Sequence, residues 1–523
     1  MTKMKLALLA GAAVIGSSAM ADTASAQTSL IYSGGSTLAS KVYRYMMDCY
    51  GVPVTPSTLS INTACSSSTG DASGLNLQIL YAPVGSGGGK RGFVNNNGSN
   101  STSAGLGTVN TLNTVPYTST LFTSYSSGYP ALEFVGSDDP LVSADLATFN
   151  GNSSVVANAG GVVQIPAFVV PVVIAVNGKD GNGNALNIQN STPTGGSSGL
   201  NLSRQALCGI VSGHITQWSN PILTALNNNT QLGTGNITWV HRSDGSGTTF
   251  IVSNALIAQC AGVTGPNSET DSTTVVYNFP WTDGKAANVA NIGNSGLCYT
   301  VSGTRVSQIP VEGSNTINWP DVGSDECGVA IPNPNAAHFA NASQSAGVTN
   351  LIQSTNGAIG YIPPDFAKPI NSTGPIAANL QNEWSVVTGT ANFVAPTQAG
   401  ANSWLSETHP PAFDASNIQS PFTWTLTINA NPAAQTSYPL AGWTYLDFYE
   451  CYTANTYTNL LSYLEFVYGP TGGNIQANQG FGPIGAYGSG VGSAEWLNFI
   501  GYIVTNYMSS AGNLGCASHA GIN

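Results

Sequence analysis

The feature that most constrains the fold is an alternation along the chain of two kinds of apolar segment. Residues 168–176 form a continuous run of β-branched and other apolar residues, typical of the buried strands of parallel sheets. Residues 250–260, 346–354 and 457–468 place their apolar residues at helical spacing. Strands that alternate with helices predict an α/β protein. With 523 residues, the chain is long enough for about two to four domains.

Residues 1–26 have the pattern of a secretory signal peptide. Lys3 and Lys5 precede the apolar run 6–15, and small residues at 19–21 and 24–26 offer two signal-peptidase sites. No later stretch approaches the roughly 18 uninterrupted apolar residues of a membrane span. We therefore expect an exported protein, periplasmic or secreted, that is not inserted in a membrane.

Charged residues are scarce, at 7% of the chain, and the net charge is −12. This balance leaves no basic patch for nucleic acid or for an anionic membrane. Gly, Ser, Asn and Thr replace the missing charges and dominate 95–114, 178–201, 262–275 and part of 369–437, which we expect to be surface loops. Because few carboxylates are available to protonate, the composition also suggests an acidic or otherwise harsh external habitat.

The cysteines are even in number, and in an exported chain they predict disulfides. No CxxC or HExxH motif is present, so neither a metal site nor a cofactor is expected. Nearest-neighbour pairing is only one of many possible connectivities. It would join Cys49 to Cys65, Cys208 to Cys260, Cys298 to Cys327 and Cys451 to Cys516.

Three glycine-rich turns could each hold an anion. Residues 33–38 precede the helical stretch 39–49, residues 84–90 follow a strand, and residues 242–249 lie between a strand and a helix. Glycine lets the backbone approach a ligand closely, and the free N–H groups of a first helical turn bind anions without net positive charge. Each segment alone is equally compatible with an ordinary tight strand-to-helix turn.

Two charged residues make the anion hypothesis more specific. Arg242 opens the third turn, and its guanidinium suits a tetrahedral oxyanion. Asp138 follows another expected strand, and an ionised carboxylate can only accept hydrogen bonds. Such a carboxylate favours a protonated phosphate over sulfate, because sulfate would leave two acceptors facing each other at a cost of about 1–3 kcal/mol.

In this order, the segments resemble the periplasmic phosphate-binding proteins of phosphate ABC transporters (PstS-like), and more closely the DING proteins. The run 242–249 (RSDGSGTT) is the most specific match. Cys208, Cys260, Cys451 and Cys516 fall where DING proteins place two disulfides. Further matches are 35–38, 85–90, 92–97 (GFVNNN), 136–138 (GSD), the hinge-crossing strand 164–177, 207–218, 357–361, 364–367 and 438–444.

The resemblance implies a ligand set for phosphate. Asp138 would accept the proton of the phosphate, and Arg242 would donate to its oxygens while Asp244 restrains the guanidinium. The remaining ligands would be hydroxyl and backbone donors from Thr37, Leu38, Ser86, Ser246, Gly247 and Thr248. Departures from the family are the greater length and the extra Cys49, Cys65, Cys298 and Cys327.

The resemblance also implies a two-domain periplasmic binding protein (Venus-flytrap) fold, type II-like, with hinge-crossing strands. Domain one would comprise 27–177 plus 376–523, and domain two 178–375. Phosphate would close the interdomain cleft, without chemistry. The implied partners are inorganic phosphate and an ABC permease, and the implied state is a monomer.

Two other functions remain possible from the sequence. A secreted phosphatase would need a nucleophile and a base, and the G-x-S-x-G match at 195–199 lies in a low-complexity loop with no strand before it. His241 adjoins the third turn, but as a strand residue next to Arg242 it is expected to point away. A surface or matrix protein could instead keep the fold and use its neutral loops for adhesion.

Overall fold

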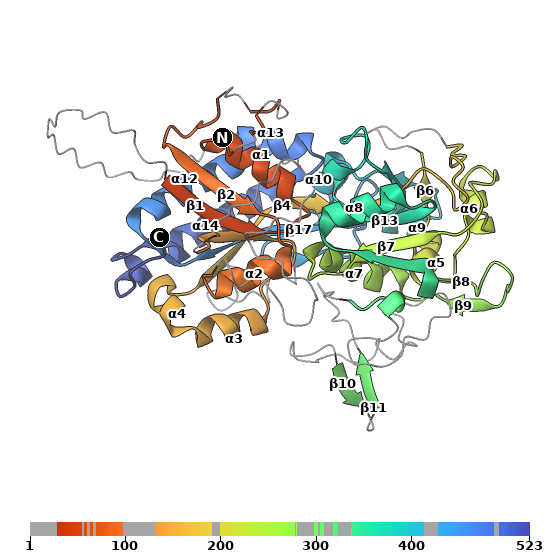
Figure 1. Ribbon diagram of the computed structural model, residues 1–523, viewed down its shortest axis with the longest axis horizontal. Helices are drawn as coiled ribbons and strands as arrows, with labels where there is room; N and C mark the ends of the chain where they lie inside the picture. The colour runs from red at the N-terminus through yellow and green to blue at the C-terminus, as the bar shows by residue number, and fades with distance from the viewer. Residues whose placement is uncertain are drawn as a thin grey trace.

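The computed structural model of the chain consists of two α/β lobes that lie side by side along its long axis (Figure 1). The predicted signal peptide, nearly all of the G-x-S-x-G match and Cys327 lie outside the described residues. The structure describes residues 29–523 except 55–56, 60–62, 66–68, 98–128, 130, 191–198, 278, 280–297, 302–303, 308–316, 323–335, 413–426 and 486–490.

The first lobe is built on a six-stranded mixed sheet with the order β19-β4-β17-β3-β1-β2. β1 is parallel to β2 and β3, whereas β17 is antiparallel to both β3 and β4. β19 is antiparallel to β4 and completes the sheet. The strands are β1 (Ser29–Gly35), β2 (Leu77–Ala82), β3 (Phe134–Ser137), β4 (Val162–Pro171), β17 (Ala441–Tyr449) and β19 (Gly482–Pro483).

Helices pack against this sheet through apolar faces. In α1 (Ser40–Tyr50), Val42, Met46 and Cys49 recur at helical spacing, are buried and face β2 and the neighbouring helices. α2 (Ser86–Val94) packs on β1 and β3. The other helices of this lobe are α3 (Ser143–Gly151), α4 (Ser153–Ala159), α10 (Gln398–Ser406), α12 (Ala454–Val467), α13 (Pro470–Asn478) and α14 (Val491–Tyr507).

The second lobe is built on a five-stranded sheet with the order β12-β7-β13-β5-β14. β7 is parallel to β12 and β13, and β5 is antiparallel to β13 and β14. α7 and α8 pack on β13. These elements are β5 (Val173–Val176), β7 (Thr238–Arg242), β12 (Phe339–Ala342), β13 (Ala358–Ile362), β14 (Ile376–Ala377), α7 (Gly247–Cys260) and α8 (Gln344–Ser354).

Smaller elements complete the described chain. They are the helices α5 (Arg204–Val211), α6 (Pro221–Leu226) and α9 (Glu383–Thr388), and the strands β6 (Asn201–Leu202), β8 (Thr264–Pro266), β9 (Thr274–Val276), β10 (Cys298–Val301), β11 (Thr304–Ser307), β15 (Asn379–Gln381), β16 (Phe393–Val394), β18 (Cys451–Tyr452) and β20 (Ser509–Ser510).

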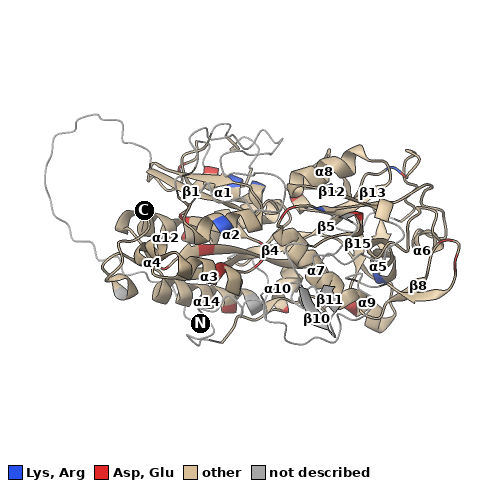
Figure 2. Ribbon diagram, turned by 60° about the horizontal axis from the view of Figure 1, so that its bottom comes forward, with Lys and Arg blue, Asp and Glu red and all other residues tan. Residues whose placement is uncertain are grey.

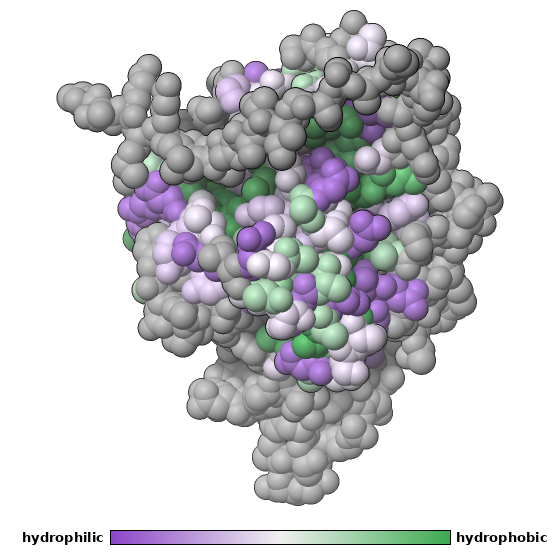
Figure 3. Space-filling model, turned by 90° about the vertical axis from the view of Figure 1, so that its left-hand side faces the viewer, coloured by the Kyte–Doolittle hydropathy of each residue, from purple (hydrophilic) through white to green (hydrophobic). Residues whose placement is uncertain are grey.

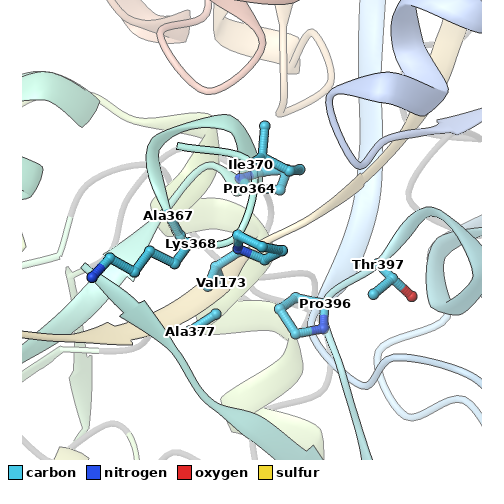
Figure 4. A pocket seen from close by; sticks show the side chains of 9 residues that line it. Val173, Pro364, Ala367, Lys368, Ile370, Ala377, Pro396 and Thr397 are labelled. Carbon is cyan, nitrogen blue, oxygen red and sulfur yellow. The ribbon is translucent and has the colours of Figure 1, made fainter. Parts of the chain in front are cut away.

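The chain crosses between the lobes at Val172, which separates β4 from β5. The backbone N–H of Val172 donates to the Leu440 carbonyl (2.7 Å), and the Tyr438 hydroxyl donates to the Val172 carbonyl (3.0 Å), so a second segment runs beside this crossing. Pro396 and Thr397, just before α10, lie near Val173 around a small cavity at the same junction (Figure 4).

Two strands belong to a different lobe from the one to which the predicted domain limits at 177 and 376 assign them. β5 and β14 fall inside the segments predicted for domain one, but both belong to the five-stranded sheet of the second lobe. The predicted domain division as a whole remains a prediction.

Two predictions about local structure are wrong. The run 168–176 is not a strand of a parallel sheet, because both β4 and β5 have antiparallel neighbours. Its residues are apolar on both faces because the run is buried throughout, with α10 and α14 packed against β4 and α8 against β5. The expected loop 262–275 contains β8 and the first residues of β9, which pair as an antiparallel hairpin.

Three of the four predicted disulfides lie within the described residues, and all three are confirmed. They join Cys49 to Cys65, Cys208 to Cys260 and Cys451 to Cys516. The fourth pairing, of Cys298 with Cys327, stays a prediction because Cys327 is outside the described residues.

Charged side chains are sparse over both lobes (Figure 2). On the face of the first lobe that Figure 3 shows, hydrophilic residues alternate with residues that range from weakly to strongly hydrophobic. Within the described part of the chain, no helix combines the length and the apolar character needed to span a membrane.

Candidate functional site

The residues proposed to bind phosphate lie where the two lobes meet. In the first lobe, 36–38 follow β1, Ser86 begins α2 after β2, and Asp138 follows β3. These three strands are parallel, so their carboxyl ends lie at one edge of the sheet, the usual position of ligand sites in α/β folds. In the second lobe, Arg242 ends β7 and 246–248 open α7.

Asp138 is buried, with 2% of its surface exposed, and is held by two serines. The Ser36 hydroxyl lies 2.7 and 2.6 Å from the two carboxylate oxygens, and the Ser86 hydroxyl lies 3.5 Å from Oδ2. The backbone N–H of Asp138 donates to Ser86 Oγ (3.1 Å). Burial raises the pKa of Asp138 to about 7, although hydrogen bonds from Ser36 and Thr444 act in the opposite direction. The carboxyl can therefore exchange a proton near neutral pH.

Arg242 is a buried cation aligned by Asp244. Its Nε donates to Asp244 Oδ1 (2.7 Å), and its Nη2 contacts Oδ2 of the same carboxylate. Its Nη1 is 3.3 Å from the Thr248 hydroxyl. Burial alone would lower the pKa of Arg242, but the Asp244 carboxylate raises it, so the guanidinium stays charged.

Helix α7 begins beside this cation. Ser246 caps the helix, because its hydroxyl accepts a hydrogen bond from the Thr249 N–H (3.2 Å). Gly247 and Thr248 form the first turn, where the positive end of the helix dipole favours an anion. All three residues predicted from this segment are buried.

Glycine is required where the lobes touch. A Cβ at Gly247 would lie 2.6 Å from both Asp138 Cβ and Ser86 Oγ, closer than non-bonded atoms approach. Gly85 has a φ of +85°, and a Cβ there would lie 2.9 Å from Asp244 Oδ2. The approach between the lobes therefore depends on the missing side chains.

Thr37 and Leu38 complete the first-lobe side of the site. Thr37 Oγ1 is 3.0 Å from Ser345 Oγ and accepts a hydrogen bond from the Ser345 N–H (3.3 Å). The Leu38 N–H lies 3.1 Å from Ser36 Oγ. The structure thus brings Thr37, Leu38, Ser86, Asp138, Arg242, Asp244, Ser246, Gly247 and Thr248 to one region between the lobes, and all of them except the partly exposed Asp244 are buried.

Sequence reasoning missed three side chains of this region. Ser36 stood inside the first glycine-rich turn, but its contact with Asp138 depends on the pairing of β1 with β3. Ser345 comes from α8, 308 residues after Thr37, and no motif marks it. Tyr361 lies in the matched segment 357–361, and its hydroxyl accepts from the Arg242 backbone N–H (3.0 Å).

His241 is engaged away from the site, as its strand position predicted. Its Nε2 lies 2.9 Å from Asp321 Oδ1, and its ring stacks on Trp319 with centroids 4.8 Å apart. Across the residues that the structure describes, no group of three or more His, Cys, Asp or Glu side chains could hold a metal ion.

Comparisons with known proteins agree with the fold. The family model described as the PBP superfamily domain matches residues 19–471. A curated relative from Pseudomonas aeruginosa strain PAO1, "Alkaline phosphatase L", is 24% identical over 90% of this chain and 89% of its own length. A "Phosphate-binding protein" from an unknown prokaryotic organism is 25% identical over 66% of this chain and 75% of its own length.

The crystal structure of a DING protein superposes with a TM-score of 0.53 at 20% identity. It covers 92% of this chain and 94% of its own. This likeness is one of fold. The family model spans most of the chain, and the two lobes carry the expected mixed sheets with helices. The chain therefore belongs to the PBP superfamily, with a periplasmic binding protein fold that is similar to those of the DING and other phosphate-binding proteins.

Proposed function

We propose that this protein captures inorganic phosphate between its lobes. The observation that carries the proposal is a buried carboxyl, Asp138, at the same interlobe contact as a buried guanidinium, Arg242, and the N-terminus of α7. The guanidinium and the helix N-terminus attract an oxyanion. A hydrogen bond between the oxyanion and the Asp138 carboxyl requires one proton, which either the oxyanion or the carboxyl must carry.

This requirement separates phosphate from sulfate. Phosphate keeps a proton at neutral pH that it can share with Asp138, whereas sulfate is fully ionised. An ionised Asp138 facing sulfate would leave two buried acceptors without a donor between them, a penalty of at least about 1–3 kcal/mol. The relative named as a phosphate-binding protein supports the same assignment.

Calorimetric titration of the protein with inorganic phosphate, with sulfate and arsenate as controls, tests the proposal. At pH 8, where Asp138 is mainly ionised, we expect tight binding of phosphate and weaker binding of sulfate by at least about tenfold. Equal affinities for phosphate and sulfate would contradict the role of Asp138. An absence of phosphate binding would refute the function and favour the surface-protein alternative.

The cellular setting belongs to the same proposal. Membership of the PBP superfamily and the pattern of residues 1–26 support an exported protein that works outside the cytoplasm. We propose that it is monomeric, without a cofactor, and that it delivers phosphate to an ABC permease.

A phosphatase is the second candidate, because a specific contact favours it. The Ser36 hydroxyl lies within 2.7 Å of the Asp138 carboxyl, an arrangement in which a carboxylate could deprotonate a nucleophile. The relative from P. aeruginosa bears a phosphatase name. Turnover of a chromogenic phosphate ester, lost in Ser36→Ala, would support hydrolysis. No turnover above that of the Ser36→Ala variant would support capture without chemistry.

A further inference from the structure

The N-terminal end of α8 connects the two halves of the interlobe site. Ser345, in its first turn, contacts Thr37 of the first lobe through two hydrogen bonds, hydroxyl to hydroxyl and N–H to hydroxyl (3.0 and 3.3 Å). The preceding residue, Gln344, donates its backbone N–H to Asp244 Oδ1 (2.8 Å). One helix end therefore touches the loop after β1 and the carboxylate that aligns Arg242.

The conformation of Gln344 is unusual for a residue with a side chain. Its φ is +62°, in the left-handed region that costs a non-glycine residue free energy. Its side chain is 2% exposed, and its Nε2, like the Ser343 hydroxyl, has no hydrogen-bond partner among the described residues. Local backbone preferences do not favour this geometry. It allows the Gln344 N–H to bond to Asp244 and the Ser345 N–H to bond to Thr37.

We propose that Gln344 and Ser345 are positioning residues that set how long phosphate stays bound. The inference rests on the proposed function. Ser345 joins α8 to Thr37 across the lobes, so its contacts can exist only while the lobes are closed. Gln344 acts through its backbone N–H, which fixes Asp244 and thereby the direction of Arg242.

An interaction made only in the closed state stabilises the complex after the ligand has entered. Its loss should therefore accelerate dissociation and leave the encounter of phosphate with the open protein unchanged. Asp138 is untouched, so the preference for phosphate over sulfate should also remain. A residue with a merely structural role would instead lower the melting temperature of the phosphate-free protein.

Stopped-flow kinetics with inorganic phosphate test this on the mature protein. For Ser345→Ala we expect the dissociation rate to rise about tenfold, the effect of one buried hydrogen bond, and the association rate to change less than twofold. The matched control is Ser354→Ala, which removes a hydroxyl from the exposed last residue of the same helix and should change neither rate.

The variant Gln344→Gly tests whether Gln344 acts through its backbone N–H or through its side chain. Glycine keeps the N–H and accepts a φ of +62°, so dissociation should stay within twofold of the unmutated protein. Faster dissociation in this variant would overturn the backbone assignment. An unchanged dissociation rate in Ser345→Ala, or a lower melting temperature of that variant without phosphate, would overturn the role of Ser345. If the unmutated protein binds no phosphate, the proposed function itself has failed.

Discussion

At the scale of single residues, Asp138 is the group that we propose selects the anion. Replacing it by Asn exchanges the charged carboxylate acceptor for a weaker, neutral amide oxygen and supplies an N–H₂ donor that suits a fully ionised oxyanion. We expect Asp138→Asn to weaken phosphate binding by about tenfold or more and to narrow the gap between phosphate and sulfate. Calorimetric titration with both anions measures the two effects.

The control for this variant is Glu465→Gln, which removes an exposed carboxyl from α12 of the same lobe and should leave both affinities unchanged. A phosphate-to-sulfate ratio that is the same in Asp138→Asn as in the unmutated protein would show that the carboxyl does not discriminate.

The same carboxyl makes anion selectivity depend on pH. Because burial raises the pKa of Asp138 to about 7, its protonated form grows as the pH falls below neutrality and can donate to sulfate. We expect sulfate affinity to increase between pH 8 and pH 5, while Asp138→Asn shows a flatter profile. Sulfate affinity that is constant over this range in the unmutated protein would contradict the prediction.

Gly247 controls the approach of the lobes rather than the choice of anion. A methyl group there would collide with Asp138 and Ser86, each 2.6 Å away. Gly247→Ala should therefore weaken phosphate binding by at least about tenfold, a cost typical of overpacking a tight contact. Gly151→Ala, where an added Cβ meets nothing within 4 Å, is the matched control. Equal affinities of the two variants would place the glycine outside the site.

The nine residues predicted for the site follow from the resemblance to phosphate-binding proteins, whose short motifs lie at the ends of strands here, and their role in binding stays a prediction. Ser345 could not be identified in this way, because its role arises from a contact with a residue 308 positions earlier. Ser36 was visible but unassigned, since a serine in a glycine-rich turn serves equally well as an ordinary turn residue. Local patterns identify groups that are positioned by their own turn. They miss contacts between residues far apart in the sequence, whether within a lobe, as for Ser36, or between the lobes, as for Ser345.

At the scale of secondary-structure elements, the same limit appears in α2. The sequence marks 84–90 only as a glycine-rich turn, and the structure shows that a helix with four glycines begins within it at Ser86. Isolated propensity opposes such a helix, but a Cβ at Gly89 would lie 2.5 Å from the Gly35 Cα, so close packing on β1 requires glycine there. Tertiary packing overrides propensity at this element.

The disulfide between Cys208 and Cys260 should stabilise the second lobe without acting on the ligand. It ties α5 to the last residue of α7, and the site lies at the opposite end of that helix, about 20 Å away at 1.5 Å per residue. Replacing both cysteines by alanine should lower the free energy of unfolding by about 2–4 kcal/mol and leave phosphate affinity nearly unchanged.

Thermal unfolding and phosphate titration of the same variant check both parts. The pair Cys49 and Cys65 offers a comparison, because it closes 16 residues rather than 52 and the chain-entropy account assigns it a smaller effect. A larger loss of stability from removing the shorter loop would contradict that account for this protein.

At the scale of the whole molecule, the low charge content has two consequences. An acidic chain can still bind an anion, because at the proposed site the donors are backbone N–H groups, hydroxyls and one guanidinium.

The second consequence concerns the few carboxyls in the chain. Several of them are buried, which is unusual for a charged group. Burial raises the pKa of Asp138 and Asp365 to about 7 and that of Glu133 to about 8.

These raised values determine how stability varies with pH. In the unfolded chain such carboxyls titrate near pH 4, so between about pH 4 and pH 8 the folded protein binds more protons than the unfolded chain. Their contribution to stability is therefore present at low pH and is lost as the pH rises through 7 to 8. The buried His338 opposes this, because burial lowers its pKa and folding then disfavours its protonation below about pH 6.5.

Below about pH 4 the dependence of stability on pH reverses, and stability decreases as the pH falls. Despite partial burial, hydrogen bonds and opposite charges lower the pKa of Asp321 and Glu383, so the stability they contribute is lost as the pH falls through those lowered values. The raised carboxyls, which also include Asp447, outnumber this histidine, so we expect the phosphate-free protein to be more stable at pH 5 than at pH 8, by a few kcal/mol. Urea titrations at pH 5, 6, 7 and 8 measure this difference.

Asp138→Asn should reduce the gain in stability between pH 8 and pH 5, because it removes one of the raised carboxyls. A free energy of unfolding that falls steadily from pH 8 to pH 5 would contradict both the pKa argument and the acidic-habitat hypothesis. A gain toward pH 5 would instead mean that the residue that selects the anion also helps the protein to persist in acid. The same burial that makes Asp138 exchange a proton near neutrality makes its ionisation destabilising, so selectivity at high pH and stability at low pH have one physical cause.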